Sequence, residues 1–418
     1  MGRPDLDLLF VSQWTPSPAS IGAQRRVEGL MKALSQRHRV SCVALLNGEH
    51  DRATAERATR AYCHELVLVP PRKEPLLTKR LLQLRVLASS RSYEHYLAAW
   101  APLRRALESM VLRRRYDAVV VEDPYLMQLG VRGAPPGERP PRVVLDEHNI
   151  WYVLAQRSQD ASGGLFRRTY HTKNWPRIMR EEMSAWREAD GVAFTSADDA
   201  DRARALSPGL TSAIVPNAVD VEHFHPRAEF PASDGKTLVF FGTLDYFPNQ
   251  DAMQYFLKDI WPRIAQGDPR AKLRVVGPRP TPEVLAYRGP RVEVTGLVPD
   301  PRPHLAAAAC IIAPLRVGGG TRFKILEAMA MGRPVVSTTV GAEGIGARPE
   351  EEILIADEPG TFASAVLRIL DAPELATRLG QAGRALVEER FSWATAAENL
   401  ERFLGELLGA GEAGRRAS

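Results

Sequence analysis

The alternation of short apolar runs with longer, helix-length segments constrains this chain most. In the first half the runs lie at 8–11, 40–46, 118–122, 143–146, 192–195 and 213–215. After a stretch rich in His, Pro and polar residues they restart, at 237–241, 273–276, 292–294, 310–313 and 334–337. Parallel strands need helical crossovers, so this pattern predicts βαβ units and doubly wound sheets. We therefore expect an α/β protein with two Rossmann-like domains.

The restart predicts the domain boundaries, and 418 residues are enough for two domains. We expect an N-terminal domain over 1–220, a linker over 221–235, a C-terminal domain over 236–390, a helix over 391–410 that packs back on the N-terminal domain, and a disordered tail over 411–418. Ser196 is a candidate helix N-cap. Doubly wound sheets bind ligands at the carboxyl ends of their strands, so two such domains would hold a ligand in the cleft between them.

Hydropathy and cysteine usage exclude several classes of protein. No apolar run approaches the ~20 residues that span a bilayer, and the first run is too short for a secretory leader. The three cysteines are scattered, which indicates buried structural thiols rather than a disulfide framework or a metal cluster. These features predict a cytoplasmic protein.

Charge is distributed unevenly along the chain. Residues 1–205 hold 32 Lys and Arg against 24 Asp and Glu, or +8, and the remainder holds 23 against 26, or −3. A basic, helical region over 72–115 could meet an acidic acceptor or the inner face of an anionic membrane. It could equally be a charged outer face of its own domain. No zinc-finger spacing or RNA-binding aromatic pattern accompanies these charges, so we expect no nucleic-acid partner.

The most informative segment is 314–334, in which three glycines stand between a strand and a helix. Gly318, Gly319 and Gly320 let the backbone approach a ligand, and a helix N-terminus favours an anion. We expect Gly320, Lys324 and Glu327 to share one helical face, at i, i+4 and i+7. The pattern predicts a site for the diphosphate of a nucleotide, with Arg322 and Lys324 as cations and Glu327 on the ribose. The alternative is a flexible loop beside a solvated helix.

Two common nucleotide-binding motifs are missing from the sequence. No Gly-Lys-Ser/Thr follows the glycines, so they do not form a Walker loop. No Gly-x-Gly-x-x-Gly follows any predicted strand, which argues against a dinucleotide oxidoreductase.

These residues resemble the retaining GT-B glycosyltransferases of family 4, also called glycosyl transferases group 1, and within them the bacterial sugar transferases with Gly-Gly-Gly-Thr-Arg before a Glu-Ala-Met-Ala helix. The resemblance covers nearly the whole chain. Its further markers lie at 18–22, 145–149, 215–220, 241–249, 294–298, 341–345 and 391–393. It implies a GT-B fold and transfer from a nucleotide-diphosphate-sugar, such as a UDP-sugar, to a hydroxyl acceptor. The acceptor would be a glycan, a lipid-linked sugar or a small molecule.

The resemblance also implies roles for individual residues. His148 corresponds to the histidine that faces the donor sugar, and Glu327 to the glutamate that binds ribose. The residues themselves, rather than the resemblance, indicate that Arg322 and Lys324 would stabilise the departing diphosphate, so we expect no metal and no cofactor beyond the nucleotide-sugar co-substrate. The remaining donor-binding candidates are Gly22, Gly242, Thr243, Gly277, Gly318, Gly319, Gly320 and Thr321. Arg25 and Asn149 are candidates for contact with the acceptor or a phosphate.

The sequence departs from the family pattern at two places. The family's first glutamate would fall at position 319, which is Gly319 here, so the donor-sugar contact must come from elsewhere. Thr243 and Asn249 stand where many relatives have Arg and Lys. Two other functions therefore stay open: a non-catalytic GT-B module that binds a nucleotide-sugar or glycan, and a nucleotide-sugar epimerase.

Overall fold

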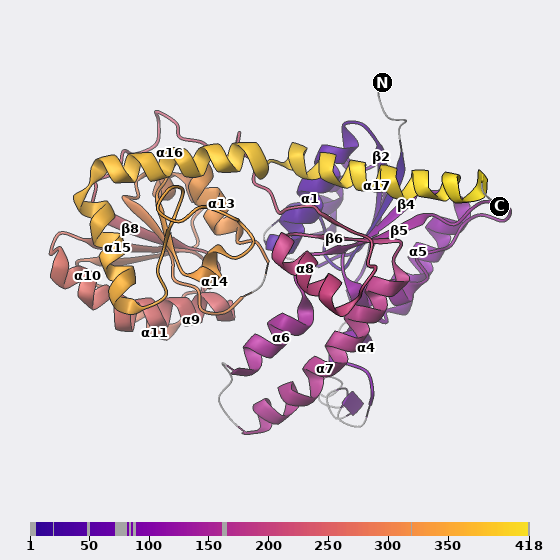
Figure 1. Ribbon diagram of the computed structural model, residues 1–418, viewed down its shortest axis with the longest axis horizontal. Coiled ribbons are helices and arrows are strands. Elements are labelled where there is room, and N and C mark those ends of the chain that lie inside the picture. Colours follow the sequence, from indigo (N-terminus) through magenta and orange to yellow (C-terminus); the bar gives the residue numbers. More distant parts are fainter. Residues whose placement is uncertain are drawn as a thin grey trace. The chain divides into compact units, whose positions relative to one another are not determined.

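The computed structural model of the protein describes residues 6–19, 21–47, 51–71, 82, 85–86, 89–160, 165–318 and 320–416. The chain divides into two compact units, each built around one sheet (Figure 1). The first unit comprises Met1–Pro216 and Ala396–Ser418, and the second comprises Asn217–Thr395. The segment 221–235, expected to be a linker, belongs to the second unit.

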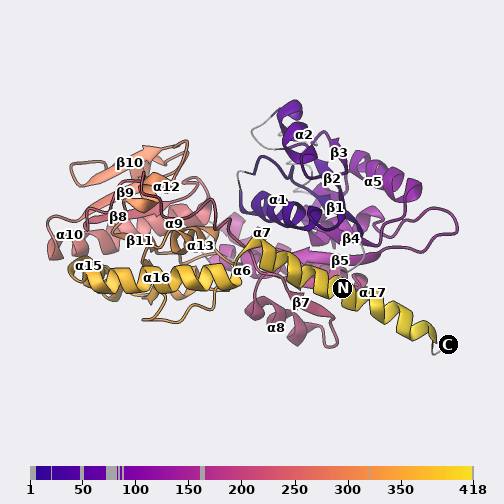
Figure 2. The same ribbon diagram turned by 90° about the horizontal axis from the view of Figure 1, so that it is seen from above.

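The first unit contains a seven-stranded parallel sheet in the order β3-β2-β1-β4-β5-β6-β7, most of which can be followed across Figure 2. Its strands are β1 (Asp7–Ser12), β2 (Arg39–Leu45), β3 (Glu65–Val69), β4 (Ala118–Val121), β5 (Arg142–Glu147), β6 (Gly191–Phe194) and β7 (Ser212–Ile214). Its helices are α1 (Gly22–Ser35), α2 (Arg52–Arg60), α4 (Tyr93–Ala98), α5 (Ala101–Arg113), the 3-10 helix η1 (Pro124–Leu129), α6 (Trp151–Asp160), α7 (Leu165–Glu188), α8 (Ala197–Leu206) and most of α17 (Trp393–Arg416).

The second unit contains a six-stranded parallel sheet in the order β10-β9-β8-β11-β12-β13. Its strands are β8 (Thr237–Phe241), β9 (Lys272–Val276), β10 (Val292–Gly296), β11 (Cys310–Ala313), β12 (Val335–Ser337) and β13 (Leu354–Ile355). Its helices are α9 (Phe247–Tyr255), the π-helix η2 (Phe256–Ile260), α10 (Trp261–Gly267), α11 (Pro282–Leu285), α12 (Arg302–Ala306), α13 (Phe323–Ala330), α14 (Thr339–Ala342), α15 (Pro359–Asp371) and α16 (Pro373–Arg390).

Strand β8 shows why both faces of the second sheet are covered by helices. Its side chains alternate between two hydrophobic clusters, with Leu238 and Phe240 in one and Val239 and Phe241 in the other. The first cluster includes residues of α9, α10 and α15, and the second includes residues of α13 and α16. All five β8 residues are buried, as expected for a strand covered on both faces. The doubly wound α/β architecture predicted from the sequence is confirmed in both units.

The last helix is tied to the first unit by an apolar stripe and an ion pair. Leu400, Phe403 and Leu404 of α17 are buried, and Phe403 packs where a side chain at Gly191 would clash with it. Glu401 Oε1 lies 3.2 Å from Arg37 Nε, with which it forms an ion pair, and 3.2 Å from His38 Nε2. The helix runs to Arg416, beyond the predicted end at 410 and into the segment expected to be a disordered tail. Its i, i+3, i+4 apolar stripe is the reason that the helix docks here.

Two strands, β3 and β13, were not predicted, although every predicted strand is present. The cap predicted at Ser196 is confirmed, because its Oγ accepts a hydrogen bond from the backbone of Asp199 at 3.2 Å. Positions 72–81, 83–84 and 87–88 of the basic region 72–115 lie outside the described residues, and Arg113 and Arg114 form ion pairs with acids of the same unit. Among the described residues, no helix is long and apolar enough to span a membrane.

Candidate functional site

The second sheet has its topological switch point between β8 and β11. The strand order runs outward from β8 in one direction and from β11 in the other, so their following connections leave toward opposite sides. Ligands of open α/β sheets bind in the crevice that this divergence leaves at the carboxyl ends of the strands. The segments that leave this point contain Gly242 and Thr243 after β8, and the glycine loop that precedes α13 after β11.

Gly242 and Gly277 allow two strand ends to meet closely. Gly242 has φ +141° and donates its backbone N–H to Val276 O at 3.0 Å. Gly277 has φ +152°, and a Cβ placed there would lie 1.9 Å from Gly242 O. Both positions therefore require glycine for the backbone itself, independently of any ligand.

Lys324 lies beside this glycine pair. Its Nζ donates a hydrogen bond to Asn249 Oδ1 at 2.7 Å and lies 4.1 Å from the centre of the Phe240 ring. Asn249 Nδ2 in turn donates to Thr243 O at 2.8 Å. A Cβ on Gly242 would be only 3.2 Å from Nζ, so glycine keeps the space in front of the amine open.

The environment of Lys324 weakens its hold on a proton. Burial, followed by the charge of Arg322, lowers the pKa of Lys324 to about 7, although Glu327 acts in the opposite direction. An amine with this pKa gains its full charge when an anion approaches. The site is thus prepared for a negatively charged ligand.

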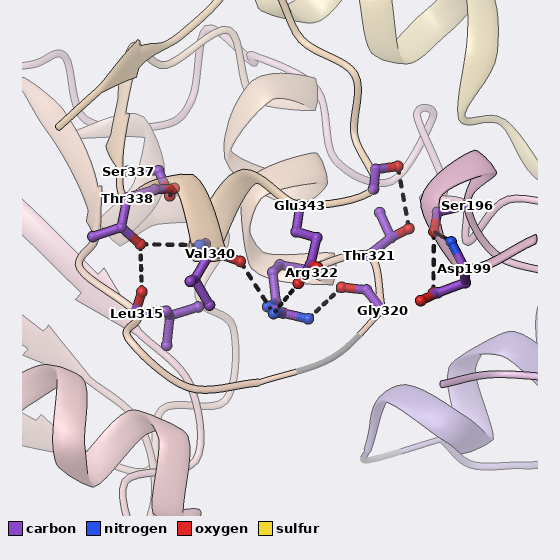
Figure 3. Close-up of polar contacts among 12 residues, drawn as sticks. Ser196, Asp199, Leu315, Gly320, Thr321, Arg322, Ser337, Thr338, Val340 and Glu343 are labelled. Atoms are coloured by element: carbon purple, nitrogen blue, oxygen red, sulfur yellow. Dashed lines mark hydrogen bonds and ion pairs between the residues drawn. The ribbon is translucent and has the colours of Figure 1, made fainter. Parts of the chain in front are cut away.

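Arg322 folds back over the glycine loop (Figure 3). Its guanidinium donates hydrogen bonds to Gly320 O and to Val340 O, the latter at 3.1 Å, and lies 3.9 Å from Glu343 Oε2. A Cβ on Gly318 would be 2.8 Å from the guanidinium. Arg322 therefore shapes the loop as well as placing positive charge beside Lys324.

The helix after the loop begins later than predicted. Gly320 has φ +65°, Arg322 is extended, and α13 starts at Phe323. The expected helical face of positions 320, 324 and 327 is therefore wrong for Gly320, because its left-handed backbone ends the loop before the helix. Lys324 and Glu327 do share the helix, at i and i+3, and Glu327 is 4% exposed.

Thr321 joins this loop to its neighbours. Its hydroxyl donates to Gly344 O at 3.5 Å, and its carbonyl accepts from Asn217 Nδ2 at 3.3 Å. Gly319 lies outside the described residues, so the structure does not address the substituted glutamate position.

The candidate residues of the first unit follow two nearby strands. Gly22 begins α1, after β1, and Arg25 lies one turn further along that helix. His148 and Asn149 follow β5 directly. The strand order β1-β4-β5 brings these carboxyl ends to one edge of the sheet. Arg26 connects the two groups, because its guanidinium binds Asp146 at 2.9 and 2.5 Å.

His148 is held by two buried carboxylates. Its Nε2 lies 2.7 Å from Glu122 Oε2 and 3.2 Å from Asp146 Oδ2. Burial alone would lower the pKa of His148, but these carboxylates raise it to about 9. Burial raises the pKa of Glu122 to about 7, and Arg26 and His148 overcome burial to lower the pKa of Asp146.

The ligand atoms of Glu122, Asp146 and His148 lie within 4.8 Å of one another, a spacing compatible with a bound metal ion. Both oxygens of Asp146, however, are already engaged by the Arg26 guanidinium. We therefore interpret the group as an ion-pair network. Sequence reasoning did not select Arg26, Asp146 or Glu122 as site residues. The acids at the ends of β4 and β5, two neighbouring strands, were the sequence signal that could have revealed this group.

Comparison with known proteins agrees with this architecture. Residues 235–372 match the family model described as glycosyl transferases group 1. The chain is 31% identical over 227 residues to a D-inositol 3-phosphate glycosyltransferase of Corynebacterium efficiens, an alignment that covers 50% of this chain and 52% of that protein.

Two solved structures resemble nearly the whole chain. Sucrose-phosphate synthase from Thermosynechococcus elongatus has a TM-score of 0.70 at 19% identity, covering 97% of this chain and 100% of that one. Anabaena Alr3699/HepE, solved with UDP and glucose, has a TM-score of 0.65 at 15% identity, covering 96% and 99%. These likenesses establish the GT-B fold.

Proposed function

We propose that this chain, whose second unit carries a glycosyl transferases group 1 domain, transfers a sugar from a nucleotide-diphosphate-sugar to a hydroxyl acceptor. The observation that carries the proposal is the position of Lys324. Its amine lies beside an open glycine turn at the switch point of the sheet, where ligands of this architecture bind. Arg322 adds a second cation on the same loop and helix junction.

Lys324 and Arg322 act on the leaving group. When the sugar departs, negative charge builds on the β-phosphate, and preorganised donors aimed at that charge lower the barrier. The partly buried Lys324 is already oriented by Asn249, so little reorganisation is needed when the diphosphate binds. Thr321 and the backbone amides of Gly318, Gly319 and Gly320 complete the phosphate site. With two cations and the amino end of α13 present, the reaction proceeds without a metal ion.

Other residues bind the rest of the donor. Glu327 takes the ribose hydroxyls, which requires a local shift because its side chain is buried. The backbone around Gly242, Thr243 and Gly277 lines the nucleotide. In the first unit, His148 contacts the sugar, Gly22 approaches the donor phosphate, and Arg25 and Asn149 contact the acceptor or a phosphate.

The transfer retains the configuration at the anomeric carbon. The bond from that carbon to the β-phosphate oxygen breaks, and the electron pair leaves with the diphosphate. The acceptor oxygen forms its bond on the same face of the sugar, and its proton passes to the departing phosphate oxygen. The products are a nucleoside diphosphate and a glycoside.

The acceptor is a glycan, a lipid-linked sugar or a small hydroxyl compound. Support comes from the name of the Corynebacterium relative, which acts on an inositol phosphate. We further propose a cytoplasmic location, with the basic first unit able to contact the inner membrane face or an anionic acceptor.

Purified protein and a panel of UDP-, GDP-, dTDP- and ADP-sugars test the proposal. One donor should raise the melting temperature, because a ligand bound only by the folded state stabilises it. That donor should then release diphosphate in an acceptor-dependent manner. R322A/K324A should remove turnover while the fold remains intact, and R368A is the matched control, since Arg368 pairs with Glu350 on the surface of the same unit.

The outcomes separate the three candidate functions. A stabilising donor without turnover supports a non-catalytic binding module, and donor isomerised without an acceptor supports an epimerase. Full sugar transfer by R322A/K324A would refute the leaving-group role given to these two residues.

A further inference from the structure

We propose that Glu122 is a positioning residue that holds His148 in the imidazolium form and leaves its Nδ1–H as the donor for a sugar hydroxyl. The contact between His148 and the sugar rests on the proposed function. The charge state of His148 is independent of the proposed function and can be measured on the protein alone.

Two carboxylate oxygens lie close to Nε2 of His148. Nε2 lies 2.7 Å from one carboxylate oxygen, of Glu122, and 3.2 Å from another, of Asp146. A deprotonated ring nitrogen would bring its lone pair against those of two anionic oxygens, which is repulsive. A proton on Nε2 turns both contacts into attraction.

Among the described residues, His148 offsets the negative charge of Glu122 most strongly, and Arg26 does so to a smaller extent. The Glu122 side chain is 1% exposed, and neither of its oxygens accepts a hydrogen bond of good geometry. A buried carboxylate without a partner costs several kcal/mol in general, so it must be paired or protonated. The His148 cation is the partner that the structure provides.

Charge balance across the network supports this assignment. Arg26 faces the group from α1 and Asp146 from β5. Glu122 follows β4 directly, and Asp123 lies next along the chain. The Arg26 guanidinium holds Asp146 ionised through two hydrogen bonds and is itself 1% exposed. An imidazolium then balances Glu122, so Arg26, Asp146, Glu122 and His148 together carry no net charge.

This arrangement defines what His148 offers to a ligand. Because carboxylates engage Nε2, Nδ1 is the ring nitrogen left for a ligand. In the imidazolium form, Nδ1 carries a proton. His148 is therefore a charged hydrogen-bond donor to the sugar and does not act as a general base. The raised pKa of His148, about 9, agrees with the geometry.

Nuclear magnetic resonance of full-length protein with 13C-labelled histidine tests the assignment. H148Q identifies the His148 signal, which is then titrated in the wild type, E122Q and E401Q after EDTA treatment. The wild-type midpoint should lie above pH 8, and E122Q should lower it by about one to three pH units, as expected for loss of an adjacent opposite charge. E401Q, which removes a carboxylate beside His38 in the same unit, should leave the His148 signal unchanged.

The pH dependence of sugar transfer then tests the positioning role. In E122Q, the loss of transfer activity at alkaline pH should begin at a lower pH than in the wild type, in parallel with the lower His148 midpoint. In E122D, this activity loss should return part of the way toward the wild-type pH. A wild-type midpoint near 6.5, a midpoint unchanged in E122Q, or a signal that differs before and after EDTA treatment would overturn the inference. If the wild type transfers no sugar but titrates as expected, the proposed function fails and the ion-pair network stands.

Discussion

Lys324 on α13 donates a hydrogen bond to Asn249 on α9, with 2.7 Å between Nζ and Oδ1. The two helices follow β11 and β8, the strands that meet at the switch point. The resemblance to family 4 implies a lysine at position 249, where this chain has Asn249. Asn249 instead orients the amine of Lys324, which comes from the other side of the switch point.

Loss of this hydrogen bond should weaken binding of the nucleotide. In N249L, Lys324 loses a charge-assisted hydrogen bond of about 1.5–3 kcal/mol and the orientation that comes with it. We expect the dissociation constant of the nucleoside diphosphate to rise about tenfold or more, as measured by calorimetry. Q254L, at an exposed position of the same helix, is the control and should bind as the wild type does. Equal affinity in N249L would show that the hydrogen bond is irrelevant to the site.

Nucleotide binding should take up a proton near neutral pH. The pKa of Lys324 is about 7 in the ligand-free chain, and an arriving diphosphate favours the charged amine and raises it. Affinity should therefore be greatest below pH 7 and fall as the pH rises above it, by at most about tenfold per pH unit. Calorimetry at pH 7.5 in two buffers of different ionisation enthalpy measures the uptake. K324M should bind weakly and without this proton, and an identical uptake in K324M would assign it to another group.

Gly277 should be intolerant of even the smallest side chain. A Cβ there would lie 1.9 Å from Gly242 O, and its φ of +152° strains any L-residue. We expect G277A to lower the free energy of unfolding by about 2 kcal/mol or more in urea titrations. G360A, in the first turn of α15 with no atom within 4 Å of the new Cβ, should change it by less than about 0.5 kcal/mol. Similar values for the two variants would contradict the close approach of the strand ends.

Most of the fold could be predicted from the sequence because local residue patterns encode its strands and helices. Apolar runs such as Cys310–Ala313 are buried strands, and β3 has the same signal in its run from Leu66 to Val69, which could have revealed it. Strand β13 has two residues, too few for any periodicity. The glycine loop was placed correctly between strand and helix, but the positive φ of Gly320 cannot be read from three equivalent glycines in a row.

The candidate site was predictable only in part, because its partners are distant in sequence. Lys324 and Arg322 could be chosen from their spacing after the glycines. Their actual contacts, with Asn249 and with Val340 O, depend on how separate βα units pack. The pairing of Arg26 with Asp146, 120 residues apart, is of the same kind. Periodicity describes an element and its buried face, whereas such contacts are set by tertiary structure.

A pair of buried acids should make the first unit less stable as the pH rises. Burial raises the pKa of Glu182 from 4.5 to about 8, and burial and Glu182 raise that of Glu147. A group with a raised folded-state pKa binds its proton more tightly when folded, so stability should fall between about pH 4.5 and 8, by at most about 1.4 kcal/mol per pH unit and proton. Glu147 Oε2 accepts a hydrogen bond from Trp186 Nε1 at 2.9 Å, which an amide oxygen can replace. E147Q should therefore flatten the decline and stabilise the protein at pH 8 in urea titrations, whereas E108Q, on an exposed position of α5, should follow the wild type. A wild-type stability that rises across this range would contradict the raised pKa values of these two acids.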